Sequence, residues 1–171
     1  MNEITSNQKS LSNSYLSFKI GEELFAAHVS QVINILELTK ITKVPRAPEY
    51  MLGVINLRGS VLPVIDTRIK FGIDISDYTT HTCIIVMEIE IDGDTIHVGS
   101  LVDSVQEVLE VEQKHILPAP NIGSKFKSEF IQGMININDN FIMLLDIDKV
   151  FSSDELIMLK ESFKIKTESN I

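Results

Sequence analysis

The chain has 171 residues, of which 44% are hydrophobic, and it carries a formal net charge of −9. This length and composition suit a globular protein with a packed core, whereas the acidic balance argues against a nucleic-acid partner or an anionic lipid surface, since both need basic patches. No apolar run approaches the roughly eighteen residues that cross a bilayer, and residues 1–13 lack the apolar centre of a signal peptide. We therefore expect a cytoplasmic protein without direct membrane insertion, and Cys83, the single cysteine, is predicted to be an inert buried thiol.

The first part of the chain predicts a leader followed by a hairpin. Residues 1–14 are polar and predict a flexible leader. Residues 15–20 and 24–27 read as two strands around a turn at Gly21. Val29, Val32 and Ile35 then recur at three-residue spacing, which predicts one or two helical turns.

A second hairpin dominates the middle of the chain. Two apolar runs within residues 53–66 flank the polar break Arg58-Gly59-Ser60, which is typical of a tight turn. The same pattern returns eighty positions later, in residues 133–146, with the glycine (Gly53, Gly133) and the closing aspartate (Asp66, Asp146) retained. The Ile-Asn pair of Asn56 returns too, so one structural unit is used twice.

The rest of the second half completes the repeat. Residues 83–91 and 95–102 predict a hairpin around Asp92-Gly93, and Val102, Val105 and Val108 repeat the valine spacing of the first half. The insertion at 121–128 predicts a surface loop, and residues 154–164 predict an amphipathic closing helix. The fold class is therefore all-β, with two small barrels or sheets that share an interface, short helical turns and a C-terminal helix.

Few residues suggest chemistry. His28, His81, His97 and His115 lack metal-ligand spacing, and the acidic and amide residues near Asn138 are better explained by a hairpin turn than by a calcium loop. Asp66 and Asp146 end strands in both copies, which favours a structural role, with hydrogen bonds from backbone donors or Arg68, over a paired-carboxylate active site. No catalytic residue, cofactor or metal is predicted.

Arg58 differs from its repeat counterpart, Asn138, so the common fold does not demand its charge. A guanidinium on a hairpin tip can present its planar donor fork to a partner. The alternative is that Arg58 braces its own loop or pairs with Asp66.

Residues 53–72, from Gly53-Val54-Ile55-Asn56-Leu57-Arg58-Gly59 to Phe71-Gly72, closely resemble the signature of the CheW family, adaptor proteins of bacterial chemotaxis. The likeness runs from about Tyr15 to Phe151 and includes residues 18–23, 44–50 and 101–108.

The resemblance implies two SH3-like barrels of five strands, at about 15–72 and 81–151, with strands that can be exchanged between them, followed by a C-terminal helix and tail at 152–171. It also implies an adaptor without catalysis that links the cytoplasmic tip of methyl-accepting chemoreceptors to the regulatory domain of the histidine kinase CheA. Other CheW copies in rings are further implied partners, and the array places the protein at the inner face of the membrane.

By position in the family, Val32, Asn34 and Arg58 are the implied receptor-contact residues. Asn34 departs from the glutamate frequent among relatives, which puts the choice of receptor in question. Gly53, Asn56, Gly59, Asp66, Gly133 and Asp146 are predicted to be turn or structural residues.

Two other functions remain open. One is a CheW-like adaptor of a non-flagellar chemosensory system, such as surface motility. The other is a small metal-dependent enzyme that uses His81, Cys83 and acidic turns.

Overall fold

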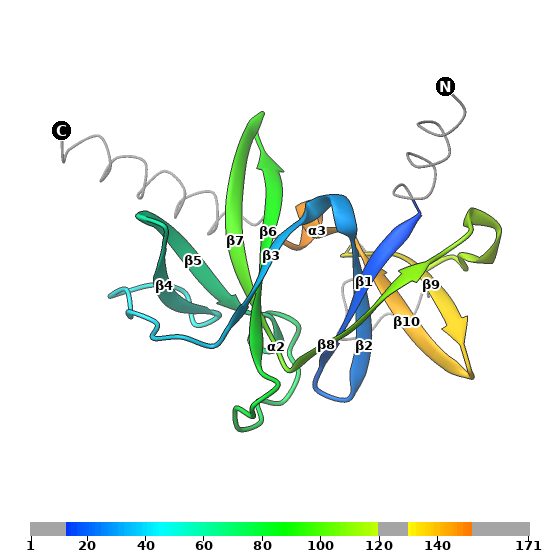
Figure 1. The fold of residues 1–171 in the computed structure, drawn as a ribbon, viewed down its shortest axis with the longest axis horizontal. Coiled ribbons are helices and arrows are strands. Elements are labelled where there is room, and N and C mark those ends of the chain that lie inside the picture. The colour runs from blue at the N-terminus through cyan, green and yellow to red at the C-terminus, as the bar shows by residue number, and fades with distance from the viewer. Residues whose placement is uncertain (1–12, 120–129, 152–171) are drawn as a thin grey trace.

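The computed structural model describes residues 13–119 and 130–151, and these form two five-stranded sheets with a few short helices (Figure 1). The strands are β1 Ser14–Ile20, β2 Glu23–His28, β3 Val32–Glu37, β4 Met51–Leu57, β5 Ser60–Asp66, β6 Cys83–Ile91, β7 Asp94–Val102, β8 Ser104–Glu110, β9 Ile131–Ile137 and β10 Asn140–Leu145. The short helices are η1 Val29–Gln31, α2 Thr67–Lys70, η2 Gln113–His115 and α3 Ile147–Val150. No helix in the described ranges is both long and apolar enough to cross a membrane.

The predicted hairpins are confirmed, each with its turn at the expected residues: β1–β2, β4–β5, β6–β7 and β9–β10. β1 begins at Ser14, one residue before the predicted start. The predicted loop at 121–128, the closing helix at 154–164 and the first twelve residues of the leader lie outside the described residues.

The helical turns predicted from Val29, Val32 and Ile35 are wrong beyond the first three residues. Only η1 is helical, and β3 follows at once as a strand paired with β6. The three-residue spacing has a physical cause: a bulge between Val32 and Asn34 inserts one extra residue, so the alternation of the strand is interrupted next to a helical turn.

The two copies of the repeat exchange their first hairpins. One sheet has the order β8-β1-β2-β10-β9 and the other β3-β6-β7-β5-β4. Each sheet therefore joins the first hairpin of one copy to three later strands of the other copy. Each exchanged hairpin is held on one side by a parallel pair, β2 with β10 or β7 with β5, and on the other by an antiparallel pair, β1 with β8 or β6 with β3. The pairs within the hairpins are antiparallel. We name the two sheets barrel A (with β1) and barrel B (with β3).

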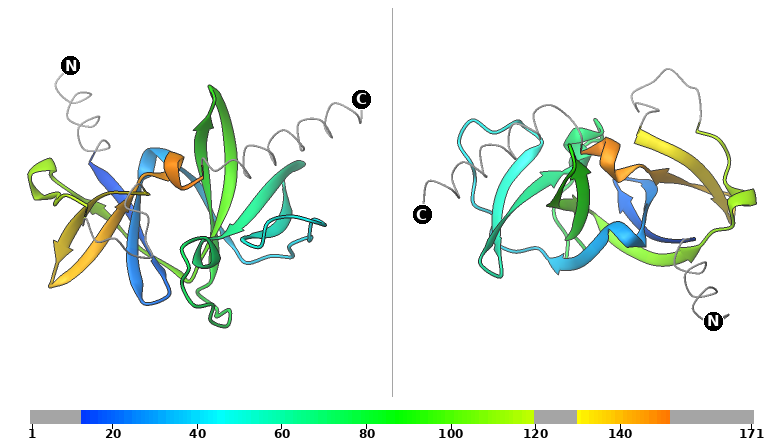
Figure 2. Two further views of the ribbon diagram at one scale, coloured as in Figure 1. Left: turned by 180° about the vertical axis from the view of Figure 1, so that it is seen from behind. Right: turned by 90° about the horizontal axis from the view of Figure 1, so that it is seen from above.

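The main apolar core lies between the barrels rather than inside either one. Small clusters fill the two interiors, around Leu144 in barrel A and around Val64 in barrel B. The larger cluster combines Phe18 and Phe25 from barrel A with Met87 from barrel B. Figure 2 shows the two barrels side by side with α3 at their junction. Because this shared core would be exposed in a separated barrel, we infer that the two fold together.

A buried arginine adds a polar link to this junction. Arg68, 1% exposed, donates from Nε and Nη2 to the carboxylate of Asp66, at 3.1 and 3.0 Å. Its Nη1 donates to the carbonyl of Ser76 at 2.8 Å and to Asp103 Oδ1 at 3.2 Å. Asp103 Oδ2 accepts from the backbone of Gly21, in the β1–β2 turn, at 2.7 Å. We call Arg68, Asp66, Asp103 and Gly21 the first clamp, since it ties α2 to the turn of the other barrel.

In each copy, one glycine allows another segment of the chain to cross a strand at short distance. Residues 41–42 cross β4, where Thr42 and Val54 exchange backbone hydrogen bonds of 2.9 and 2.8 Å. A Cβ on Gly53 would lie 2.1 Å from the Thr42 carbonyl oxygen. Residues 116–117 make the equivalent crossing over Gly133, where a Cβ would lie 2.5 Å from a methyl group of Ile116. The repeat therefore retains both glycines because the backbone or a side chain occupies the space of a Cβ.

We expect Gly53→Ala to lower the free energy of unfolding by at least about 2 kcal/mol, because a backbone carbonyl blocks the new methyl group. Gly72→Ala is the control, since Gly72 also has a positive φ (70°) but open space around it. It should cost about 1 kcal/mol. Urea denaturation measures both, and equal losses would contradict the steric explanation.

We also expect Arg68→Met to lower the free energy of unfolding by about 3–5 kcal/mol, because it leaves the Asp66 carboxylate buried without its partner. Asp103→Asn should cost clearly less, since the Asp103 side chain is 19% exposed and Arg68 keeps Asp66. Chemical denaturation of both variants gives the comparison. A smaller loss for Arg68→Met than for Asp103→Asn would show that the guanidinium is not the centre of the clamp.

Candidate functional site

The three candidate contact residues all lie on barrel B, on two of its structural elements. Val32 and Asn34 belong to β3, the strand at one end of the sheet order, and Arg58 lies between β4 and β5 at the other end. The crossing of Thr42 over Val54 leads the chain from the end of β3 back to β4. The segment between β3 and β4 therefore packs on β4, in the same barrel as the three candidate residues.

Val32 and Asn34 are both half-buried. Val32 packs against the core between the barrels, so its side chain supports the structure as well as being a candidate contact. The Asn34 side-chain oxygen accepts from the backbone N–H of Ile35 at 2.8 Å. This local bond holds the amide close to its own strand.

Arg58 occupies the first position of a two-residue turn. Its φ is 54° and that of Gly59 is 87°, the pair of positive values that defines a type I′ hairpin turn. Asn56 supports the turn, because its Oδ1 accepts from the Gly59 N–H at 2.8 Å. In the β9–β10 turn the corresponding residue, Asn138, has φ 52°, and asparagine tolerates this region much better than arginine.

The alternative in which Arg58 pairs with Asp66 is wrong. Asp66 is buried and receives Arg68 instead, and Arg58 is exposed. Among the described residues Arg58 takes part in no ion pair. The backbone of Arg58 therefore has an unfavourable positive φ, while its guanidinium forms no ion pair with a described residue. This combination is expected of a residue that binds a partner.

Asp66 and Asp146 share a second feature as well as their place at the strand ends. Each is the N-cap of the following helical turn: Asp66 accepts from Arg68 N at 3.0 Å, and Asp146 accepts from Lys149 N at 3.2 Å. The hydrogen bonds expected from Arg68 and from the backbone are confirmed at Asp66. The two carboxylates serve two separate caps, one in each copy.

Exposed apolar side chains are the site feature that the sequence analysis missed. Ile35 on β3 is 45% exposed and Val61 on β5 is 60% exposed. Their repeat counterparts on barrel A, Val108 and Phe141, are 59% and 51% exposed. Strand alternation alone would not have found them, because some of their sequence neighbours, such as Ser60 and Glu107, are exposed as well.

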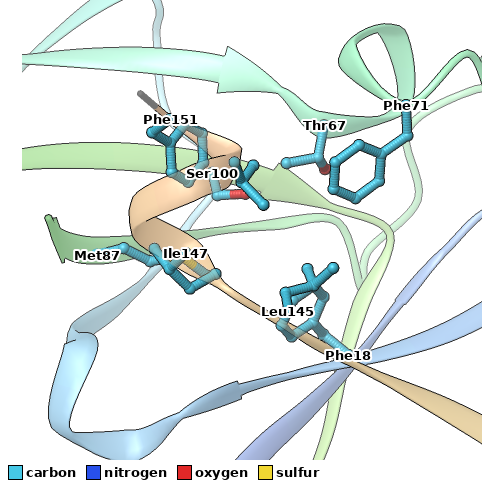
Figure 3. A pocket seen from close by; sticks show the side chains of 9 residues that line it. Phe18, Thr67, Phe71, Met87, Ser100, Leu145, Ile147 and Phe151 are labelled. Carbon is cyan, nitrogen blue, oxygen red and sulfur yellow. The ribbon is translucent and has the colours of Figure 1, made fainter. Parts of the chain in front are cut away.

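The hollow between the barrels carries no catalytic arrangement. Apolar side chains line most of it, including Phe18, Phe71 and Phe151, with Thr67 and Ser100 as the polar members (Figure 3). Thr67 donates to the Leu101 carbonyl at 2.6 Å. Ser100 Oγ is buried without a hydrogen-bond partner in the described structure. An apolar lining with two hydroxyls supplies no general base and no set of metal ligands.

The residues of the metal-enzyme hypothesis do not form a centre. In the ranges 13–119 and 130–151, His, Cys, Asp and Glu side chains form no group of three or more that could hold a metal ion. Cys83 is half-buried rather than fully buried as predicted. Burial raises the pKa of its thiol, more than a hydrogen bond with the Val105 backbone lowers it, so the thiolate that would bind a metal is disfavoured.

Known proteins match this chain over nearly all of the described residues. The family model for the CheW-like domain matches residues 14–155. The chemotaxis protein CheW of Rhizobium meliloti (strain 1021) is 36% identical over 140 residues, which cover 82% of this chain and 88% of that protein. CheW of Klebsiella aerogenes is 30% identical over 145 residues, 85% of each chain. The crystal structure of the scaffolding protein TtCheW from Thermoanaerobacter tengcongensis matches with a TM-score of 0.74 and 30% identity, over 84% of this chain and 90% of that one.

The energetic cost of the positive φ at Arg58 can be measured as a change in the free energy of unfolding. We expect Arg58→Asn to raise the free energy of unfolding by about 0.5–1 kcal/mol, because asparagine adopts the first position of a type I′ turn more readily. The reverse change in the other copy, Asn138→Arg, should lower it by a similar amount. Urea denaturation of the two variants tests the pair. Loss of stability in Arg58→Asn would mean that the arginine braces its own loop.

Proposed function

The chain belongs to the CheW family of chemotaxis adaptor proteins, and from this premise we propose that it couples methyl-accepting chemoreceptors to the histidine kinase CheA in signalling arrays. The CheW-like domain would comprise residues 15–151, with two pseudo-repeated subdomains, and would reach the inner face of the membrane through the receptors. The adaptor would act by binding alone, without a cofactor or catalysis of its own.

The observation that carries the receptor side of this proposal is the Arg58 turn. The common fold does not need arginine there, as Asn138 shows, and the positive φ makes arginine the less favourable choice. A guanidinium on a rigid two-residue turn can give a bidentate contact to a carboxylate, or bind backbone carbonyls, on a receptor hairpin. Val32 and Asn34, on the same barrel, would complete the receptor contact.

The exposed apolar residues support further protein contacts. Ile35 and Val61 on barrel B, and Val108 and Phe141 on barrel A, lie at equivalent positions of the two copies. Protein interfaces combine such apolar side chains with a polar rim. We propose that Val61 on β5 and Phe141 on β10, outside β3, bind the regulatory domain of CheA and, in rings, other copies of the adaptor.

A second candidate is a CheW-like adaptor of another chemosensory system, such as one for surface motility. Asn34 favours it, because the amide is neutral and is already bonded to the Ile35 N–H. A receptor that expects a carboxylate at this position would bind less well. Copurification of the chain with a different kinase would decide for this alternative.

The main test is a reconstituted kinase assay with receptor, CheA and the adaptor. We expect Arg58→Asn to weaken receptor binding about tenfold or more, because truncated arginines are frequent hot spots, and to reduce receptor-dependent kinase activation accordingly. Affinity for CheA should stay unchanged. Since the same variant is expected to stabilise the turn, unfolding would not explain the loss.

Lys43→Asn is the matched control, because it removes one exposed positive charge from the same barrel without touching the turn. It should leave activation near the wild-type level. If wild type neither binds CheA nor changes its activity, the array assignment fails. If Arg58→Asn and Lys43→Asn reduce receptor-dependent kinase activation equally, the loss comes from the change in net charge and not from the Arg58 guanidinium.

A further inference from the structure

The junction between the barrels has a second polar link, at the position equivalent to the first clamp. Arg68 is the second residue after the Asp66 cap of α2, and Asp148 is the second residue after the Asp146 cap of α3. Each side chain bonds to one of the two connections between the barrels. Arg68 bonds to Asp103, between β7 and β8, and Asp148 bonds to Gln31, between β2 and β3. The two links lie at equivalent positions of the repeat but have different chemistry.

The second link is built on a single carboxylate oxygen. Asp148 Oδ1 accepts from Gln31 Nε2 at 3.0 Å and from the backbone N–H of Glu90, on β6, at 3.2 Å. The Gln31 amide also lies 3.4 Å from the Glu88 carbonyl. We call Asp148, Gln31 and Glu90 the second clamp. It pairs a charged group with neutral donors and is half-buried, whereas Arg68 of the first clamp is almost fully buried among two carboxylates.

The second clamp acts directly on the start of β3. Gln31 is the last residue of η1, and Val32 begins the strand. Among the strands of barrel B, β3 pairs only with β6, and a bulge interrupts that pairing between Val32 and Asn34. The strand end that carries two of the proposed receptor contacts therefore has few backbone bonds of its own, and the hydrogen bond of Gln31 to α3 is one of the contacts that fix it.

We propose that Gln31 and Asp148 are positioning residues for receptor binding: through their hydrogen bond, α3 of barrel A holds the beginning of β3 in the conformation that the receptor recognises. Neither residue needs to touch the receptor. This inference rests on the proposed function, because it concerns the receptor contact of β3.

The test measures two affinities for each variant of the full chain. Gln31→Ala and Asp148→Ala should each weaken binding of a soluble receptor signalling fragment about tenfold, roughly the effect of one hydrogen bond to a charged group. The double variant should be no weaker than Asp148→Ala, since both single variants remove the shared bond and Asp148→Ala also removes the bond to the Glu90 N–H. Affinity for CheA should remain as in wild type. Asp148→Asn keeps an acceptor oxygen and should retain receptor binding.

A separate readout follows the strand itself. Backbone amides of residues 32–37 should exchange hydrogen about fivefold faster in Asp148→Ala than in wild type or Asp148→Asn. The control for general loss of stability is Ile135→Val, a buried change within barrel A, which should leave receptor affinity and β3 exchange unchanged.

Several results would overturn the proposal: equal losses of receptor and CheA affinity, additive losses in the double variant, or the same loss in Ile135→Val. If wild type binds CheA but no receptor fragment, the proposed function fails and the positioning role fails with it. If wild type binds the receptor fragment while Asp148→Ala does so equally well, the proposed function stands and only the positioning role is lost.

Discussion

The buried guanidinium of Arg68 is the constraint on which the junction of the two barrels depends. A buried charge is tolerated only when it is paired and its donors are satisfied. Asp66 takes Nε and Nη2, while Asp103 and the Ser76 carbonyl take Nη1. Hydrogen bonding to Asp66 raises the pKa of Arg68, although burial lowers it, and the charges of Asp66 and Asp103 add to the rise, so the residue stays charged. Since Asp103 also binds the Gly21 N–H, satisfying Arg68 fixes one barrel against the other.

The exchange of hairpins also fixes one barrel against the other, through apolar contacts. Each barrel borrows two strands from the other copy, so Phe18 and Met87 meet in a core that belongs to neither barrel alone. An adaptor must hold several partners in a defined relative geometry, and a shared core is suited to that because close-packed interiors transmit displacement rather than absorb it. The proposed contact residues on the two barrels are thereby held at a fixed distance and orientation to each other.

Local signals in the sequence predicted most of the fold. The turns at Arg58-Gly59 and Asp92-Gly93 identified their hairpins, and the repeat identified Asp66 and Asp146 as equivalent. Only the family resemblance indicated the exchange of hairpins; the local patterns did not, because each hairpin has the same alternation and could equally pair within its own copy. Arg68 and Asp103 are 35 positions apart, and nothing local indicates that they meet. The helical prediction at Val29–Ile35 failed because a bulge mimics a three-residue period. At the candidate site, the comparison of Arg58 with Asn138 identified one residue, whereas the exposed Ile35 and Val61 depend on which face of the strand is covered.

The differences between the two copies are more informative about function than their similarities. Within the described residues, three hairpins use two successive positive φ values, and two of them have Asp92 or Asn138, which suit this conformation, at the first of the two positions. Only the third begins with arginine. On the helical turns that follow β5 and β10, the equivalent residues are Arg68 and Asp148, which makes one clamp buried and strong and the other half-buried and weaker. Where the two copies have different residues at equivalent positions, the fold that they share does not explain the difference. In this chain Arg58 lies on barrel B and the weaker clamp adjoins its strand β3, and the proposed receptor contact is on the same barrel.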